Sequence, residues 1–135
     1  MATGYFDGGR RGNSNVDGDG VAGAGYVIRD NDKIYAGYVY IGHKKTNNEA
    51  EYTGMISLLE RAKKEGITKI HVLGDSKLAI MQVQQKWKCN KPHLAKLRDK
   101  CWAVDIDATY EHIPRDENKE ADLLSNVAMD RRVSC

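Results

Sequence analysis

The spacing of apolar residues changes near residue 47, and this change limits the possible folds more than any other feature of the chain. Residues 22–28 and 33–41 are rich in β-branched and aromatic residues, and the intervening Arg-Asp-Asn-Asp favours a turn. The apolar positions that follow instead lie on one face of a helix: Met55, Leu58, Leu59 and Ala62. Thr46 or Asn47 can cap this helix and Gly66 ends it. The sequence therefore predicts an antiparallel hairpin followed by a helix.

The same reasoning divides the rest of the chain into strands and helices. We expect a first strand at residues 5–7 that ends at Gly8-Gly9, followed by a glycine-rich loop to Gly20. The later elements are expected as a strand at 67–73, a helix at 78–87, a helix that starts at Pro92, a strand at 108–113 and a helix at 116–129. This order predicts an α/β fold whose five-stranded mixed sheet joins three antiparallel strands to two parallel ones, with helices on both faces. We expect residues 1–135 to form a single domain.

The composition excludes several classes of protein. With 41% hydrophobic and 30% charged residues the chain is typical of a globular domain. No run approaches the ~20 apolar residues of a membrane-spanning helix, and the first residues show no secretory signal. The three cysteines, an odd number without paired spacing, argue against a disulfide framework or a zinc site. We therefore expect a reducing, cytoplasmic setting and no contact with a membrane.

Charge is distributed unevenly, although the net charge is only +2. Residues 61–100 contain 11 Lys and Arg against three Asp and Glu, whereas residues 101–135 contain four against eight. A basic middle between acidic ends suggests a surface for a polyanion next to a group of carboxylates. A solvated helical surface explains the lysines equally well, and charge alone does not decide between the two.

Four carboxylates occupy positions at which strands end or helices begin. Asp7 is expected at the end of the first strand, Asp75 at the end of a later strand, and Asp122 in the first turns of the last helix. Glu51 lies four residues before Met55 and continues the apolar face of its helix, where an unpaired carboxylate is costly. Taken singly, each has an ordinary alternative as a turn residue, a helix cap or a first-turn acid. Together they can meet at one edge of the sheet, where α/β folds build their sites.

Carboxylates that meet in this way repel one another, and a divalent cation removes the conflict. Ligand sets made only of oxygen favour Mg²⁺ or Mn²⁺ over Zn²⁺. Two such ions can stabilise both the attacking and the leaving oxygen of a phosphodiester. The residues therefore predict a two-metal hydrolysis site formed by Asp7, Glu51, Asp75 and Asp122.

Four segments resemble the type 1 ribonuclease H family, and the match spans nearly the whole chain. Residues 46–52, Thr-Asn-Asn-Glu-Ala-Glu-Tyr, are similar to the Thr-Asn-Asn-x-x-Glu helix opening of that family. Residues 7–13, Asp-Gly-Gly-Arg-Arg-Gly-Asn, and Asp75-Ser76 resemble two further motifs, and residues 114–122 resemble the Asn-x-x-Ala-Asp ending. Each segment alone is a weak signal, but four in the correct order on the expected elements are highly specific.

The resemblance implies metal-dependent, endonucleolytic cleavage of the RNA strand of an RNA–DNA hybrid, which leaves 5′-phosphate and 3′-hydroxyl ends. It implies two Mg²⁺ ions, for which Mn²⁺ can substitute. Asp7 would contact both ions, Asp122 would hold the ion that activates water, and the ion at the leaving group would lie on Glu51 and Asp75. The substrate contacts implied by the matching motifs, including those that read the 2′-hydroxyl in the minor groove, are Asn13, Asn47, Asn48 and Ser76.

His112 lies ten residues before Asp122, which is the spacing of the family histidine that assists proton transfer or product release. We therefore include it in the expected catalytic set. It ends a predicted strand and precedes Ile-Pro-Arg instead of a glycine-rich loop, so a structural role is an equal alternative.

Only 46 residues separate Asp75 from Asp122, too few for the extra basic helix and loop of many bacterial members. In this the chain is similar to the shorter archaeal, plant and retroelement-associated forms. Hybrid binding is then expected to depend on Lys77, on Lys96 and on what we call the basic segment, Lys86, Trp87, Lys88 and Lys91. The alternative for Trp87 is that it packs on the core.

Two other functions remain open. One is another two-metal nuclease of the same fold, such as a resolvase or transposase core, which would lack the Thr-Asn-Asn helix opening. The other is a nucleic-acid-binding module without activity, against which the presence of all four acids argues. We expect a monomer, because no exposed apolar heptad is visible.

Overall fold

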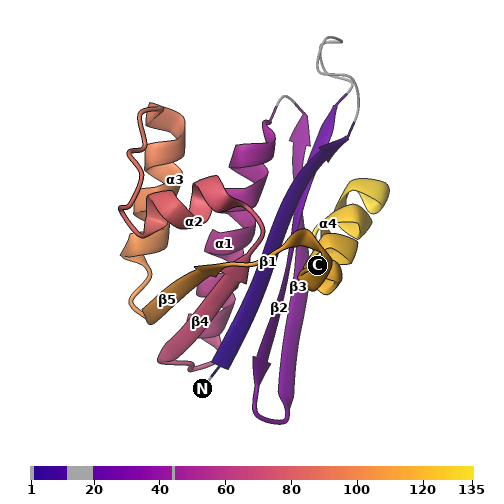
Figure 1. Cartoon of the computed structure of the whole chain (residues 1–135). Coiled ribbons are helices and arrows are strands. Elements are labelled where there is room, and N and C mark those ends of the chain that lie inside the picture. Colours follow the sequence, from indigo (N-terminus) through magenta and orange to yellow (C-terminus); the bar gives the residue numbers. More distant parts are fainter. Residues whose placement is uncertain (1, 12–19, 44) are drawn as a thin grey trace.

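The computed structural model describes residues 2–11, 20–43 and 45–135, which form one sheet with helices on both faces (Figure 1). The strands lie in the order β3-β2-β1-β4-β5, with bounds β1 Ala2–Arg11, β2 Val21–Asp30, β3 Lys33–His43, β4 Lys69–Gly74 and β5 Asp107–His112. The helices are α1 Asn47–Lys64, α2 Lys77–Val83, α3 Pro92–Ala103 and α4 Lys119–Arg131, preceded by a 3₁₀ turn, η1 Arg115–Glu117. The mixed sheet and the order of its elements confirm the predicted α/β fold.

The pairing of β1 changes along its length, and this change positions the site. β1 runs antiparallel to β2, and this register continues to Arg11, which lies opposite Val21. Its parallel pairing with β4 stops earlier, at Phe6 opposite Gly74. Within the described residues, β1 therefore has no neighbouring strand on its β4 side beyond Phe6. Asp7 is the first residue of β1 after its last pair with β4.

The prediction that the first strand ends at Gly8-Gly9 is wrong. Both glycines are paired within the sheet, opposite Ala24 and Gly23 of β2. Glycine is required at position 8 for another reason: a Cβ there would lie 2.2 Å from the carbonyl carbon of Ala50. The glycine that suggested a turn instead permits close approach between strand β1 and helix α1.

Helix α1 lies over one face of the sheet and α4 over the other. The apolar stripe of α1 is fully buried, as the periodicity predicts, at Met55, Leu58, Leu59 and Ala62. Thr46 caps α1 in a capping box, since its hydroxyl accepts the N–H of Glu49 at 3.1 Å and the Glu49 carboxylate accepts the N–H of Thr46. On the opposite face, a Cβ at Gly25 would lie 2.7 Å from the carbonyl oxygen of Ala121, so glycine allows α4 to approach β2. The first turns of both helices therefore reach the middle of the sheet.

Two helices differ from their predicted extents. α2 ends at Val83 instead of continuing to Trp87, because Gln85 adopts a positive φ of 64° and the chain turns there. Trp87 is 42% exposed, so the alternative that it packs on the core is wrong. The helix predicted at 116–129 is divided into η1 and α4 at Asn118. The buried Asn118 side chain donates from Nδ2 to the carbonyl of Phe6 at 2.8 Å, and this tertiary contact holds the break in place.

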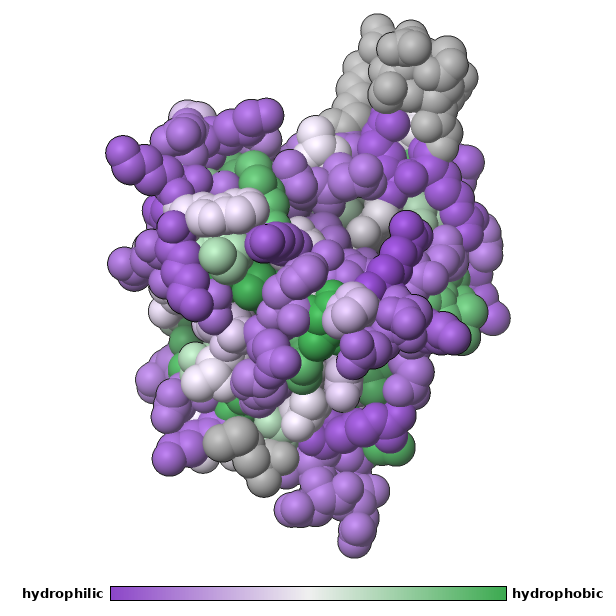
Figure 2. Space-filling view, viewed as in Figure 1, coloured by the Kyte–Doolittle hydropathy of each residue, from purple (hydrophilic) through white to green (hydrophobic). Residues whose placement is uncertain are grey.

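Three further observations concern the composition of the chain. Cys89, Cys101 and Cys135 are free thiols. Among the described residues, no helix combines the length and apolar character that crossing a membrane requires. The face of the molecule in Figure 2 is mostly hydrophilic, and its apolar residues form small separate areas.

Candidate active site

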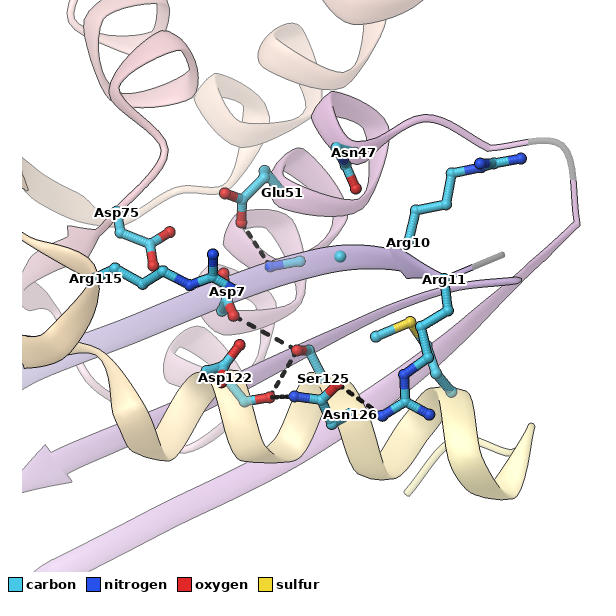
Figure 3. A pocket seen from close by; sticks show the side chains of 13 residues that line it. Asp7, Arg10, Arg11, Asn47, Glu51, Asp75, Arg115, Asp122, Ser125 and Asn126 are labelled. Carbon is cyan, nitrogen blue, oxygen red and sulfur yellow. Dashed lines mark hydrogen bonds between the residues drawn. The ribbon is translucent and has the colours of Figure 1, made fainter. Parts of the chain in front are cut away.

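An open cavity of about 450 Å³ lies over β1 where β4 leaves the sheet (Figure 3). Acidic, amide and basic side chains from β1, α1, η1, α4 and the residue after β4 line this space, which we call the acidic cavity. All four predicted carboxylates are among its lining residues: Asp7, Glu51, Asp75 and Asp122. The fold thus brings together acids that lie up to 115 residues apart in the chain.

Asp7 lies in β1 and is only 6% exposed. The hydroxyl of Ser125 in α4 donates to Asp7 Oδ2 at 3.5 Å. The backbone just before it is fixed by Asn118, which donates to the Phe6 carbonyl. Ser125, whose hydroxyl also lies 2.8 Å from the Asp122 carbonyl, therefore approaches Asp7 from the α4 side, and Asn118 fixes the residue before it. The turn role considered for Asp7 from the sequence is wrong.

Glu51 lies in the first turns of α1 and is buried, as its place on the apolar stripe predicts. The backbone N–H of Gly8 donates to Glu51 Oε1 at 2.5 Å. This contact depends on the missing side chain at Gly8, since a Cβ there would lie 2.4 Å from the backbone nitrogen of Glu51. The alternative that Glu51 points to solvent is wrong.

Asp75 follows β4 directly and is half-buried. Ser76, not Asp75, caps α2, because the Ser76 hydroxyl accepts the N–H of Ala79 at 3.3 Å. The Asp75 carboxylate lines the acidic cavity, where one oxygen each from Asp7, Glu51 and Asp75 lie within 4.8 Å of one another. Asp122, in the first turn of α4, lines the same cavity from the other face of the sheet.

Burial and mutual repulsion alter the titration of these acids. Burial raises the pKa of Asp7 to about 7, and the charge of Asp75 is the next largest cause. Burial also raises the pKa of Glu51 well above its usual value, with the charge of Asp7 adding to the effect. Without a cation both groups therefore keep a proton to higher pH than an ordinary carboxyl group. A compact set of carboxylate oxygens whose charges conflict fits a hard divalent cation such as Mg²⁺ or Mn²⁺.

The predicted substrate contacts reach the acidic cavity only in part. Asn47, at the start of α1, lines it, and the next residue, Asn48, is half-buried outside the lining residues that the structure describes. Ser76 is buried and its hydroxyl caps α2. Asn13 lies outside the described residues.

Neither His112 nor the basic segment is among the described lining residues of the acidic cavity, although His112 lies opposite Gly74, the residue before Asp75. His112 is exposed at the end of β5 and is not among the described lining residues. The basic segment occupies the exposed stretch between α2 and α3, where the ammonium of Lys77 lies 5.9 Å from the centroid of the Trp87 ring. The roles of His112 and of this segment stay predictions.

Several lining residues were missed by reasoning from the sequence: Arg10, Arg11, Arg115, Ser125 and Asn126. In Figure 3 the side chain of Arg115 extends into the cavity between Asp75 and Asp122. Signals for the arginines were present, since Arg10 and Arg11 follow directly after Gly9 and Arg115 lies within the segment at 114–122. The first two were overlooked because the strand was expected to end before them.

The chain matches proteins of a known family. Residues 7–128 match the family model described as reverse transcriptase-like. A bifunctional protein of Mycobacterium tuberculosis is 40% identical over 129 residues, which cover 92% of this chain and 34% of that protein. This chain therefore spans about a third of the length of the mycobacterial relatives that it matches.

Two solved structures are similar along their whole length. The crystal structure of RNase H1 from the halophilic archaeon Halobacterium salinarum has a TM-score of 0.86 at 36% identity, covering 96% of this chain and 98% of that chain. LC11-RNase H1, solved in complex with an RNA/DNA hybrid, has a TM-score of 0.82 at 32% identity, covering 98% and 99%. The fold, the four gathered acids and these matches lead to one conclusion: the chain belongs to the type 1 ribonuclease H family.

Proposed function

We propose that this chain is an endoribonuclease that hydrolyses the RNA strand of RNA–DNA hybrids and leaves 5′-phosphate and 3′-hydroxyl ends. The observation that carries the proposal is the convergence of carboxylate oxygens from Asp7, Glu51 and Asp75 within 4.8 Å. Family membership supports it, as does the hybrid bound to a relative that is 32% identical.

The four carboxylates of the acidic cavity would hold two Mg²⁺ ions, with Mn²⁺ as a substitute. Asp7 would contact both ions, Asp122 would hold the ion on the side of the attacking water, and Glu51 with Asp75 would hold the other. When bound, the two ions stabilise the attacking and the leaving oxygen of the phosphodiester. The raised pKa values of Asp7 and Glu51 support this assignment, because a cation relieves the repulsion that otherwise retains protons.

Other residues of the chain orient these acids. The Gly8 N–H fixes one oxygen of Glu51, and the Ser125 hydroxyl reaches one oxygen of Asp7. Asn118 fixes the backbone ahead of Asp7 through the Phe6 carbonyl. Orientation before the substrate arrives lowers the reorganisation that the reaction requires.

Selection of RNA over DNA would take place at the start of α1. Asn47 lines the acidic cavity there, and an amide can both donate to and accept from a 2′-hydroxyl. We assign the same task to Asn48 and retain Asn13 and Ser76 as further substrate contacts.

Two basic side chains are candidates for assisting the reaction beside the acids. His112, at the exposed end of β5, would assist proton transfer or product release. Arg115 lines the cavity itself and carries a permanent positive charge beside the site where negative charge develops.

The basic segment would add sequence-independent affinity for the hybrid, since its lysines are exposed and Trp87 is 42% exposed. We propose that the protein acts as a monomer in the cytoplasm. The mostly hydrophilic face in Figure 2 and the three free thiols support this setting.

The proposal is tested by incubating the protein and Mg²⁺ with end-labelled RNA–DNA hybrid, duplex DNA and single-stranded RNA of one sequence. The expected result is cleavage of the RNA strand of the hybrid alone, with 5′-phosphate on the new ends. Cleavage of duplex DNA would favour another two-metal nuclease. Binding of the hybrid without cleavage would favour the inactive binding module.

A further inference from the structure

The end of β1 carries two adjacent arginines whose surroundings differ. Side chains alternate between the faces of a strand. Arg11 lies on the α4 face, where it forms an ion pair with Asp130 and donates from Nη2 to Asn126 at 2.7 Å. Arg10 lies on the α1 face, as Gly8 does. Among the described residues no acidic side chain forms an ion pair with Arg10, although Arg10 lines the acidic cavity.

The guanidinium of Arg10 is packed against the backbone. It lies over Gly20, where a Cβ would come within 2.3 Å of Arg10 Nη2. Glycine at position 20 therefore leaves the space that the guanidinium fills. In Figure 3 Arg10 extends along the rim of the acidic cavity on the side of Asn47, away from the carboxylates. A cation held in this way loses less conformational entropy when it binds an anion.

The two ends of the acidic cavity therefore differ in charge. The four carboxylates lie at one end, where Arg115 extends between Asp75 and Asp122, and Arg10 lies at the other end, away from the carboxylates. Arg10 follows Asp7 by three residues, which places its Cα about 10 Å further along an extended strand. This distance corresponds to about two or three nucleotides of a nucleic acid strand. A guanidinium can bind a phosphate through two parallel hydrogen bonds.

We propose that Arg10 binds a backbone phosphate of the RNA strand about two or three nucleotides from the cut. This inference rests on the proposed function and assigns the substrate a second anchoring point beyond the acids. Arg10 is a binding residue in this account, because it contacts a phosphate that does not react. Its contribution is equal in the ground state and the transition state, so it acts on KM and not on kcat.

The first test is Arg10→Gln, with Arg10→Lys as the conservative variant and Arg29→Gln as the matched control. Arg29 lies at the end of β2 that is far from Arg10, where it faces Thr3 of β1. Its guanidinium forms an ion pair with Glu120. Affinity for the hybrid is measured as a function of salt with Ca²⁺ in place of Mg²⁺, and the strands are checked for cleavage afterwards. Arg10→Gln should lower the slope of log K against log salt by about 0.7–0.9, whereas Arg10→Lys and Arg29→Gln should keep it.

With Mg²⁺, Arg10→Gln should raise KM about fivefold and leave kcat within about twofold. Thermal unfolding of each variant shows whether the fold is retained, and the retained slope of Arg10→Lys separates a charge effect from lost packing over Gly20.

The second test identifies the phosphate. Single uncharged methylphosphonates are placed along either strand, each on a 2′-O-methyl nucleotide in the RNA, with 2′-O-methyl phosphodiesters as controls. Wild-type affinity should fall at one position of the RNA strand near the cut, and Arg10→Gln should be insensitive there. An unchanged salt slope, or a sensitive position on the DNA strand, would overturn the proposal for Arg10. Absence of hybrid cleavage by the wild type would instead contradict the proposed function.

Discussion

At the scale of single residues, burial of Asp7 and Glu51 carries a cost in folding free energy. Both carboxyl groups are buried, and burial is the largest cause of the raised pKa of each. A buried carboxylate is tolerated only if hydrogen bonds or a cation compensate for lost hydration. The Gly8 N–H and the Ser125 hydroxyl supply part of this compensation. A bound proton supplies more of it in the metal-free protein, and under the proposed function cations would replace that proton.

Replacing Asp7 by Asn should therefore stabilise the metal-free protein, and the gain should depend on pH. The pKa of Asp7 is about 7 in the fold, against 3.8 for an unperturbed group. Between these values folding takes up a proton, so the contribution of Asp7 to stability falls as pH rises from about 4 to 7. Asparagine has no such dependence. The variant should match the wild type near pH 4 and exceed it most at pH 8, by at most about 4 kcal/mol.

Urea unfolding of both proteins in EDTA at pH 5, 6, 7 and 8 measures this difference. A gap that stays constant over the series, or narrows with rising pH, would refute the raised pKa of Asp7. Glu51→Gln is the parallel case, with the same sign, because the pKa of Glu51 is raised for the same first reason.

Arg115 and His112 make a second comparison at this scale. Arg115→Ala should lower kcat roughly tenfold to a hundredfold, since Arg115 lines the acidic cavity and its charge lies where negative charge develops. His112→Ala should lower kcat by less than about tenfold, because His112 is exposed outside the described lining. Steady-state kinetics on the hybrid measure kcat for both variants. A larger decrease in kcat for His112→Ala than for Arg115→Ala would show that the histidine assists the reaction more than the arginine does.

Individual acids could be predicted because their local patterns carry the information. Glu51 continues a helical apolar stripe, and that periodicity alone indicates a buried carboxylate. Arg115 lies within the matching segment at 114–122, but no periodicity directs it to the cavity, and the neighbouring break at Asn118 is held by the distant Phe6 carbonyl. Reasoning from the sequence therefore finds the acids but misses the cations beside them.

At the scale of elements, the site depends on how closely α1 approaches β1. Gly8 allows the helix backbone to lie directly over the strand, and its own N–H then reaches Glu51. The adjacent Gly9 faces the other side, where a Cβ would meet Met129 Cε at 3.5 Å, an ordinary contact. The two neighbouring glycines therefore form a natural test and control.

Gly8→Ala should destabilise the protein by roughly 3 kcal/mol and reduce hybrid cleavage at least about a hundredfold, because the clash is with the backbone of α1 and displaces Glu51. Gly9→Ala should change stability by less than about 1 kcal/mol. Denaturant unfolding and initial rates measure both. Similar behaviour of the two variants would show that the close approach at Gly8 is unimportant.

Boundaries of elements were the hardest part to predict, and each error has a tertiary cause. Gly8-Gly9 suggested a turn, but pairing with β2 carries β1 on to Arg11. The helix at α2 was predicted too long because Gln85, at a positive φ of 64°, gives no local signal for ending it. Element types and order followed from periodicity, whereas these ends depend on contacts between distant segments.

At the scale of the whole molecule, the topology gathers the acids at one place and the positive charge lies mainly on other residues. The sheet order places Asp7 in β1 next to Asp75, which directly follows the neighbouring strand β4, and the helices bring Glu51 and Asp122 from opposite faces. Positive charge collects elsewhere, on residues 61–100. The order of the elements could be predicted from the sequence, and this order directs the four acids to one edge of the sheet.

The basic segment is tested by replacing Lys86, Lys88 and Lys91 together by Ala. If all three reach phosphates, the log–log salt slope for hybrid binding should flatten by about 2–3 units, KM should rise and kcat should stay nearly constant. A triple variant of equal charge, at Lys33, Lys64 and Lys69, is the control, because these exposed lysines lie where β3 starts, α1 ends and β4 starts. Equal slopes for the two triple variants would show that the basic segment is merely solvated.

The measurement that most directly tests the central claim is single-turnover cleavage of a labelled RNA–DNA hybrid by the wild type and Asp7→Asn in Mg²⁺, with hybrid affinity measured in parallel. Asp7 belongs to the acid cluster and interacts with the other three acids, whereas proteins gain affinity for a nucleic acid mainly from phosphate contacts. The account predicts that Asp7→Asn abolishes cleavage and leaves the hybrid Kd largely unchanged. Cleavage by Asp7→Asn within tenfold of the wild-type rate would contradict it.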